Sequence, residues 1–438
     1  MDRVMAKKNT ANYVDRLLIK LDDAITPIWN SIFLSLSNLP AKELFFEVLS
    51  DLIKETPRLR SLWNKSQAYW EEVKLSEEQL VESFNFDPNP CDKMDRIHLI
   101  LQSKVNLSQS LPIRVWIGKT TDDPDRWLLS FQLHHAAGDG RSIIFIVQRF
   151  WDLLNKKLHQ YPLKYRSLAG PQMTDPKILK KIYSYKKSLV YLAQSKYRQL
   201  ARRADALSHQ AHQVGHPILQ SCRFNLSNEK HLKRKGDELF YSALLAAVAC
   251  SEDDGQDKVI RIRIPIDLRA FLSIKEPSVE NACSAVVLEL SLKTLKSIFH
   301  DQPHQLGLFM KKELKQALRQ HRYLSNALEC MLISRLSTAK TMQKAAKEEI
   351  LAPKRSSSLV ITHFGDVTKY IKPPTPIKLS EVLGHTPVWG GNSYIYEDTM
   401  YFNVTCFDGI WDKEMMKKFT RCGADWLRSH YGMEGELL

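Results

Sequence analysis

The stretch His134-His135-Ala136-Ala137-Gly138-Asp139-Gly140 lies between a strand pattern and a helix pattern. Residues 127–133 read Trp-Leu-Leu-Ser-Phe-Gln-Leu and predict a β-strand that runs directly into the two histidines. After Gly140 the apolar residues recur at helical spacing through residues 143–154. The stretch is therefore expected to form a loop that joins a strand to a helix.

Residues 134–140 carry the groups needed for proton transfer. His135 is the candidate base, because an imidazole can take a proton from an alcohol or amine and return it to a leaving group. Asp139 lies close enough to hold the loop through a hydrogen bond or a salt bridge, and Gly140 leaves room for a turn or a substrate. His134 points away from His135 if the strand continues through both, so we expect it to support the structure. These four residues are the candidate catalytic set.

Motifs that are typical of several other enzyme classes are absent from the sequence. The sequence has no G-x-S-x-G, HExxH or P-loop pattern, so serine hydrolase, zinc protease and nucleotide hydrolase activities are not indicated. Its seven cysteines include no CxxC pair, which is typical of reduced, mostly buried thiols. We expect no metal site and no permanently bound cofactor.

Length and charge set the broad class. A chain of 438 residues favours two domains. The net charge of +14 favours anionic partners, such as nucleic acid, anionic lipid, coenzyme A phosphates or acidic carrier proteins, without choosing among them. No secretion signal is evident and the longest apolar run, residues 241–250, is too short for a bilayer, so we expect a cytoplasmic protein.

Both halves of the chain mix strands and helices, which predicts an α/β fold. We expect an N-terminal lobe over residues 1–175, a basic connecting segment over 176–205 and a C-terminal lobe over 206–438. The connecting segment carries nine basic residues and no acidic residue between 176 and 204, and is either a solvated helix face or a membrane-surface contact.

Hydrophobic spacing predicts the individual elements. Residues 12–53 are expected to form a helical layer, and residues 113–117 and 127–133 two strands. In the second half we expect a helix over 239–250, helical segments over roughly 305–350, and strands over 218–226, 259–268, 358–362, 393–397 and 400–407.

At residues 134–140 the sequence resembles the thioester-dependent acyltransferase superfamily with an HHxxxDG motif, which includes chloramphenicol acetyltransferase, condensation domains, alcohol acetyltransferases and wax-ester synthases. Three further segments are similar to family segments. Residues 55–60 resemble "HP-x-LR", with Thr56 in place of His. Residues 265–269 followed by Asn281 resemble "P-x-DLR … GN", and residues 362–366 resemble "SN-x-G" or "DFG". His363 stands where Asn or Asp is common.

The resemblance implies two chloramphenicol acetyltransferase-like lobes, each a mixed β-sheet with flanking helices, and an active-site tunnel between them. It implies His135 as general base without a covalent acyl-enzyme, and a salt bridge from Asp139 to an arginine of the second lobe that holds the lobes in register. Arg269 is the candidate arginine, and Thr362 is the candidate oxyanion donor. The alternatives are a solvated charge at a strand end for Arg269 and a simple β-forming residue for Thr362.

Three functions remain open. The first is acyl transfer from acyl-CoA to a small or lipid-like hydroxyl or amine acceptor. The second is a free-standing condensation domain whose acyl group arrives on the phosphopantetheine arm of a carrier protein. The third is a non-catalytic scaffold of the same fold that docks through the basic segment, for example on an anionic membrane. Nucleic acid is not the expected partner.

Overall fold

The computed structural model describes residues 8–9, 11–22, 28–123, 125–161, 163, 168, 170, 173–185, 189–194, 197, 204–205, 207, 215–227, 230–251, 258–274, 277–351, 354–355, 357–386, 390–411 and 413–438. Contacts divide the chain into two compact units. Unit 1 comprises Met1–Lys177, Asp267–Cys283 and Thr368–Thr386, and unit 2 comprises Ile178–Ile266, Ser284–Val367 and Pro387–Leu438. Each unit has its own large sheet and its own buried core.

Unit 1 combines a mixed sheet with helices. Its strands are β1 (Lys8–Asn9), β2 (Trp29–Ser37), β3 (Ser61–Asn64), β4 (Tyr69–Glu72), β5 (Phe84–Cys91), β6 (Ile113–Thr120), β7 (Trp127–His134) and β14 (Lys378–His385). Its helices are α1 (Tyr13–Leu21), α2 (Lys42–Glu55), α3 (Glu77–Glu82), α4 (Lys93–Leu101), α5 (Gly140–His159) and α14 (Thr368–Ile371), and α6 (Asp175–Ser184) begins in it.

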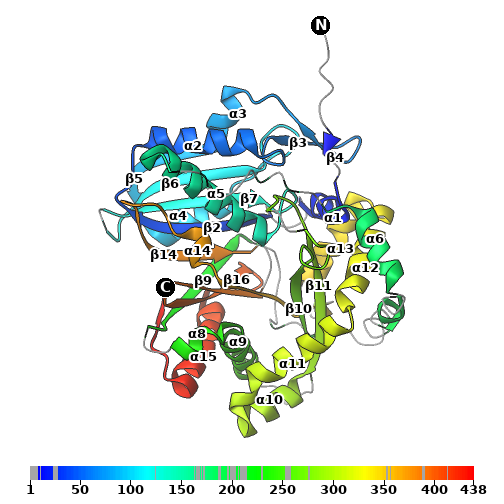
Figure 1. Ribbon diagram of the computed structural model, residues 1–438. Helices are drawn as coiled ribbons and strands as arrows, with labels where there is room; N and C mark the ends of the chain where they lie inside the picture. The colour runs from blue at the N-terminus through cyan, green and yellow to red at the C-terminus, as the bar shows by residue number, and fades with distance from the viewer. Residues whose placement is uncertain are drawn as a thin grey trace. The chain divides into compact units, whose positions relative to one another are not determined.

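Strand β7 is the middle strand of the five-stranded sheet, whose order is β14-β2-β7-β6-β5. It pairs antiparallel with β2 and β6, whereas β5 and β6 are parallel. Side chains alternate across β7: the ring of Phe131 packs against Phe150 of α5, and Gln132 donates to the carbonyl of Ile100 in α4. Helices α5 and α4 therefore cover opposite faces of this strand (Figure 1), whose last residue is His134.

The helical layer expected over residues 12–53 is only partly present. Helices α1 and α2 form there, but the residues between them form strand β2, so the expected helix around Phe33, Leu34 and Leu36 is wrong. Strand β2 lies between β14 and β7, and eight of its nine residues are buried. A strand covered on both faces is apolar at successive positions, which removes the alternation that would have revealed it.

Unit 2 has more elements. Its strands are β8 (Ala204–Asp205), β9 (Pro217–Asn225), β10 (Val259–Asp267), β11 (Cys283–Ser291), β12 (Lys354–Arg355), β13 (Leu359–Asp366), β15 (Gly390–Tyr396), β16 (Thr399–Phe407) and β17 (Gly435–Leu437). Its helices are α8 (Lys230–Lys233), α9 (Gly236–Ser251), α10 (Leu292–Asp301), the 3₁₀ turn η2 (Pro303–Gln305), α11 (Leu306–Arg319), α12 (Arg322–Leu336), α13 (Ala339–Leu351) and α15 (Lys413–Tyr431). The bounds of β10 and β11 each reach one residue into unit 1.

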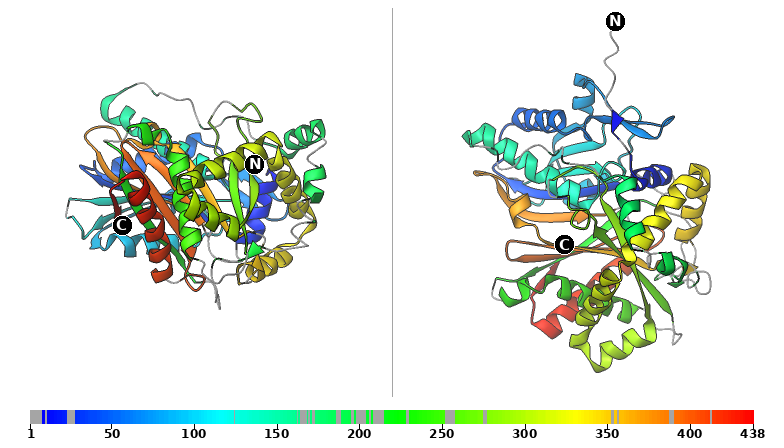
Figure 2. Two further views of the ribbon diagram at one scale, coloured as in Figure 1. Left: turned by 90° about the horizontal axis from the view of Figure 1, so that it is seen from below. Right: turned by 45° about the vertical axis from the view of Figure 1, so that its right-hand side comes forward.

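The seven-stranded sheet of unit 2 has the order β11-β10-β13-β15-β16-β9-β17. Strand β13 is parallel to β10 and β15, whereas β15, β16 and β9 are joined by antiparallel pairing. Helices α9 and α15 pack side by side and contact this sheet (Figure 2). Gly423 of α15 permits that approach, because a Cβ there would lie 2.9 Å from the carbonyl oxygen of Ala243. Both units thus have the mixed α/β architecture that the sequence predicts.

Two segments group differently from the expected division at residues 175 and 206. That division assigns residues 267–283 and 368–386 to the C-terminal lobe, whereas their contacts place them in unit 1. Strand β14 explains the second assignment, because it completes the unit 1 sheet beside β2. Three of the nine basic residues of the expected connecting segment are exposed on α6, namely Lys177, Lys180 and Lys181. The other six lie outside the described residues.

Candidate active site

The HHxxxDG stretch lies where β7 ends and α5 begins. Asp139 is the N-cap of α5, and its Oδ1 accepts hydrogen bonds from the backbone N–H groups of Arg141 at 3.1 Å and Ser142 at 3.0 Å. A carboxylate here satisfies helix donors that have no partner within the helix. Gly138 packs tightly in this loop, because a Cβ at this position would lie 2.7 Å from Leu133 Cδ2.

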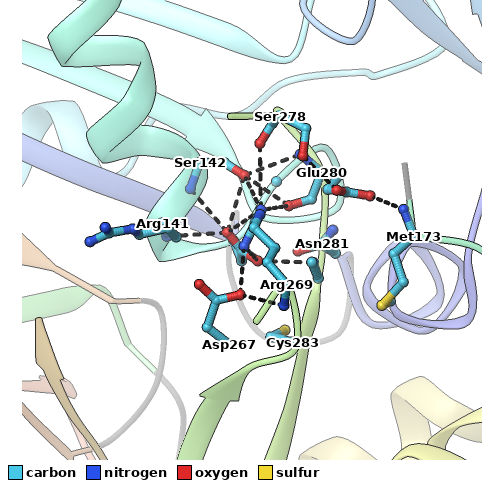
Figure 3. Close-up of polar contacts among 12 residues, drawn as sticks. Arg141, Ser142, Met173, Asp267, Arg269, Ser278, Glu280, Asn281 and Cys283 are labelled. Carbon is cyan, nitrogen blue, oxygen red and sulfur yellow. Dashed lines mark hydrogen bonds and ion pairs between the residues drawn. The ribbon is translucent and has the colours of Figure 1, made fainter. Parts of the chain in front are cut away.

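Asp139 also forms a buried ion pair with Arg269, whose polar contacts with Ser142 and Glu280 are drawn in Figure 3. Arg269 Nη1 lies 3.0 Å from Asp139 Oδ2, and Nη2 lies 3.2 Å from Oδ1. The same guanidinium donates to Ser142 Oγ at 3.2 Å and to the carbonyl of Glu280 at 3.1 Å, and the N–H of Ala282 donates to Asp139 Oδ2 at 2.9 Å. The carboxylate therefore ties the loop to residues 269–282.

This pair lies within unit 1, because Arg269 belongs to the 267–283 segment. Arg269 lies in the expected C-terminal lobe by its position in the sequence, whereas its contacts group it with unit 1. This contact anchors the 267–283 segment beside α5. Arg269 is also not a solvated charge, since its side chain is 6% exposed.

The two charges of the pair keep each other ionised. Burial alone would raise the pKa of Asp139, but the charge and hydrogen bonds of Arg269 hold it below its ordinary value. Burial would lower the pKa of Arg269, and Asp139 raises it instead. Asp139 is therefore an unsuitable proton carrier at neutral pH and a suitable structural anchor. The neighbouring Glu280 differs, because burial raises its pKa.

His135 is held through its backbone. Its N–H donates to the carbonyl of Ile28 at 2.7 Å, and its carbonyl accepts from Asn281 Nδ2 at 2.8 Å. Its ring Nδ1 is buried and makes no hydrogen bond within the described part of the chain. Burial lowers the pKa of His135, while the backbone of His135 and Gly138 and the charge of Asp139 oppose that change. At neutral pH the ring is therefore uncharged, which is the form a base requires.

His134 has a different environment. It is fully buried, its Nε2 lies 2.8 Å from Asp22 Oδ1, and its Nδ1 accepts from the N–H of Ala136 at 3.2 Å. An acceptor at Nδ1 places the proton on Nε2, where it is donated to the carboxylate. The ring also meets Trp29 edge to face, with centroids 5.4 Å apart. No surface is left for a substrate, so His134 is suited to fixing the loop.

Thr362 lies in unit 2, on β13. Its register partner on β15 is Asn392. Asn392 in turn is opposite Asn403 of β16, and Asn403 is opposite Ser221 of β9. Asn403 donates to Asn392 at 2.8 Å, and Ser221 donates to Asn403 at 2.6 Å. A polar row therefore crosses four strands on one face of the sheet. It ends at Thr362, which is partly exposed, whereas the other three residues are buried.

His363 faces the opposite side of β13 from Thr362. Its Nδ1 lies 2.6 Å from Ser393 Oγ, and its ring stacks on Phe240 of α9 with centroids 6.2 Å apart. Burial lowers its pKa to about 4. The histidine that replaces the common Asn or Asp is thus an uncharged side chain packed between the sheet and α9.

Asp15 is one of the residues at this site that sequence reasoning missed. Asp15 of α1 is fully buried and accepts from Asn281 Nδ2 at 2.9 Å. The local pattern Asn12-x-x-Asp15 is a capping box that marks the start of α1, and it could have been recognised. The contact with Asn281 has no local signal, because the two residues are 266 positions apart.

Within the described ranges, no three His, Cys, Asp or Glu side chains are grouped so as to hold a metal ion. No helix in the same part of the chain is long and apolar enough to cross a bilayer. Cys91, Cys222, Cys250 and Cys422 are free thiols.

No family model matches the sequence, and no curated protein matches it. Solved structures do match the fold. Trichothecene 15-O-acetyltransferase from Fusarium sporotrichioides matches with a TM-score of 0.70 at 13% identity, over 95% of this chain and 94% of that chain. The starter condensation domain of rhizomide synthetase in complex with C8-CoA matches with a TM-score of 0.63 at 13% identity, over 97% and 95%. The epimerization domain from the third module of tyrocidine synthetase B matches with a TM-score of 0.64 at 13% identity, over 97% of each chain.

The chain therefore has the fold of these acetyltransferase, condensation and epimerization domains, which agrees with the fold that the HHxxxDG resemblance implied. The names of these three proteins describe three different activities: acetyl transfer, condensation and epimerization. The reaction of this chain must therefore be argued from its own residues.

Proposed function

We propose that this protein is an acyltransferase that moves an acyl group from a thioester donor to a hydroxyl or amine acceptor, with His135 as general base. The observation that carries the proposal is the state of that imidazole. Burial lowers its pKa, so it is uncharged at neutral pH, and hydrogen bonds hold both sides of its backbone. Because Nδ1 is buried, Nε2 is the nitrogen that would face an acceptor.

The proposed reaction needs no covalent acyl-enzyme. Nε2 of His135 takes the proton of the acceptor O–H or N–H, and the acceptor oxygen or nitrogen attacks the thioester carbon. The tetrahedral intermediate carries a negative oxygen, for which the hydroxyl of Thr362 is the proposed donor. When the intermediate collapses, the carbon–sulfur bond breaks and the thiolate takes the proton from the imidazolium. The products are an ester or amide and a free thiol.

Acyl-CoA is the proposed donor. The net charge of +14 favours an anionic co-substrate, and a structural neighbour is complexed with C8-CoA. Free thiols suit a reducing compartment, so we place the reaction in the cytoplasm.

The test is to incubate the purified protein with acyl-CoA and a panel of alcohols and amines, and to follow both free CoA and acylated product. Stoichiometric formation of the two with acyl-CoA as the sole donor supports the proposal. The absence of acyl transfer from both acyl-CoA and an acylated carrier protein would overturn it.

A carrier-dependent condensation reaction is the second candidate, and it is favoured by the likeness to a condensation domain. It uses the same base and differs only in what delivers the thioester. Comparing acyl-CoA with the same acyl group on a phosphopantetheinylated carrier protein separates the two. Transfer from the carrier alone would favour condensation.

A further inference from the structure

Unit 1 contains a second buried ion pair, between Arg58 and Asp15. Arg58 Nη1 lies 2.8 Å from Asp15 Oδ2, and the two side chains are 2% and 0% exposed. Trp70 Nε1 donates to the same carboxylate oxygen at 3.2 Å, and the Arg58 guanidinium lies 5.0 Å from the centre of the Trp70 ring. Such a pair is costly to bury unless further hydrogen bonds satisfy its remaining atoms. It therefore needs partners beyond itself.

The other oxygen of Asp15 provides that connection. Asp15 Oδ1 accepts from Asn281 Nδ2 at 2.9 Å. The same nitrogen lies 2.8 Å from the carbonyl oxygen of His135 and 3.0 Å from that of Ala136. Three oxygens around one amide nitrogen fix its orientation, because a flipped amide would place oxygen against oxygen. Asn281 thus links the ion pair to the backbone of His135.

Asn281 is itself fixed from a second direction. The side chain of Asn12, the N-cap of α1, donates to the carbonyl of Asn281 at 2.7 Å. Because Asn12 and Asp15 are both in the first turn of α1, one rigid helix end holds both the backbone and the side chain of Asn281. Asn281 is fully buried, so water does not compete for these bonds.

We propose that Arg58, Asp15 and Asn281 are positioning residues for His135: the ion pair orients the Asn281 amide, which fixes the two carbonyls that set the direction of the imidazole. This inference rests on the proposed role of His135 as general base. A base must be held within about 0.5 Å of its productive place, and a misplacement of about 1 Å can cost about a hundredfold in rate. None of the three residues contacts the reacting atoms in this account.

The test compares Asp15→Asn and Asn281→Ala with a matched control, Glu55→Gln. Glu55 forms another ion pair in unit 1, with Arg149, and the Glu55→Gln variant removes the same charge as Asp15→Asn. Asn281→Ala breaks no ion pair, so it remains informative if Asp15→Asn does not fold. Three quantities are measured: the thermal midpoint, kcat and KM with acyl-CoA, and the pKa of the His135 ring by NMR of ¹³C-labelled histidine, assigned with His135→Gln.

In both test variants we expect the His135 pKa to move up towards 6.5, because a loosened loop admits water to the ring. His134 and Asp139, the charged or titratable groups that act on this ring, are unchanged in every variant. We expect kcat to fall about tenfold to a hundredfold, with KM for acyl-CoA changed less than about threefold. Glu55→Gln should lower the thermal midpoint and leave kcat and the His135 pKa as in the native protein.

A His135 pKa and kcat that stay unchanged in both test variants would overturn the inference, since the cluster would then serve folding alone. The NMR result does not depend on turnover. If the native protein transfers no acyl group, the proposed function fails, while the ring pKa still decides whether the three residues position His135.

Discussion

Asp139 performs three structural tasks with one carboxylate. It caps α5, it pairs with Arg269, and it accepts from the N–H of Ala282. Each of these bonds is charge-assisted, and such bonds are stronger than those between neutral groups. The cost of taking both charges out of water is offset only while both partners are present. The loop that carries His135 is therefore most sensitive to the loss of one member of the pair.

Replacing Arg269 with Met should lower the free energy of unfolding by about 3–5 kcal/mol, because it leaves the Asp139 carboxylate buried without a cation. The double variant Asp139→Asn/Arg269→Met should be more stable than Arg269→Met alone. Urea titration measures both values. The control is Lys417→Met, which breaks a surface pair with side chains 49% and 82% exposed and should cost less than about 1 kcal/mol. Equal losses in Arg269→Met and the control would contradict this account.

At the scale of elements, the site depends on a sharp connection between β7 and α5. Four residues separate His134, the last residue of β7, from Asp139, the N-cap of α5. Gly138 lies in this turn with no room for a side chain, since a Cβ would lie 2.7 Å from Leu133 Cδ2 and 2.8 Å from Ser142 Cβ. The turn brings the strand and the helix together, and the glycine permits that approach.

Gly138→Ala should therefore push the loop away from β7. We expect a loss of stability of about 1–3 kcal/mol, as is usual when a packed interior must accept an extra methyl group. Because the displaced loop carries His135, kcat should fall more than KM rises. Thermal unfolding and steady-state kinetics measure the two effects. A variant with native stability and native kcat would show that the loop has more space than its contacts indicate.

Several elements predicted from sequence formed at their expected positions. Strands β6, β7, β9 and β16 and helices α5 and α9 all formed where the spacing of apolar residues placed them. Strand β2 was missed because its apolar residues were read at helical spacing, although both of its faces are buried in a sheet. Arg261 of β10 is also buried: its side chain is 2% exposed and pairs with Glu289 at 2.7 Å.

At the scale of the whole molecule, each unit contains a histidine whose pKa is lowered by burial, so that folding is opposed by acid. His385 in unit 1 and His363 in unit 2 both have a pKa lowered to about 4 by burial, below the ordinary value of 6.5. Between pH 6.5 and 4 the unfolded chain binds protons that the folded chain does not. Stability is therefore fully present above pH 6.5 and is lost as the pH falls towards 4.

We expect each histidine to contribute up to about 3 kcal/mol to this loss. Urea unfolding midpoints measured from pH 7.5 to pH 4 should fall steadily below about pH 6.5. His385→Asn cannot take up the proton, so its curve should be flatter over the same range, even if its midpoint at pH 7.5 is lower. A midpoint that is constant between pH 6.5 and 4.5 in the native protein would contradict the burial of uncharged histidines.

The candidate site was predictable where its residues are neighbours in sequence. His135, Asp139 and the strand–loop–helix setting follow from residues 127–154, and Arg269 followed from the resemblance. Asp15 could not be identified, since its contact with Asn281 depends on how α1 and the 267–283 segment pack in unit 1. For the same reason no local signal in the sequence indicated that the contacts of the 267–283 segment group with unit 1.

The most direct measurement is the turnover number of His135→Ala, beside the native protein, with the same acyl thioester and acceptor. The account predicts that kcat falls by about 10²- to 10⁴-fold, the usual contribution of a general base, while the thermal midpoint stays within a few degrees of the native value. Full turnover by a folded His135→Ala protein would contradict the central claim, and would leave the fold as a scaffold without this base.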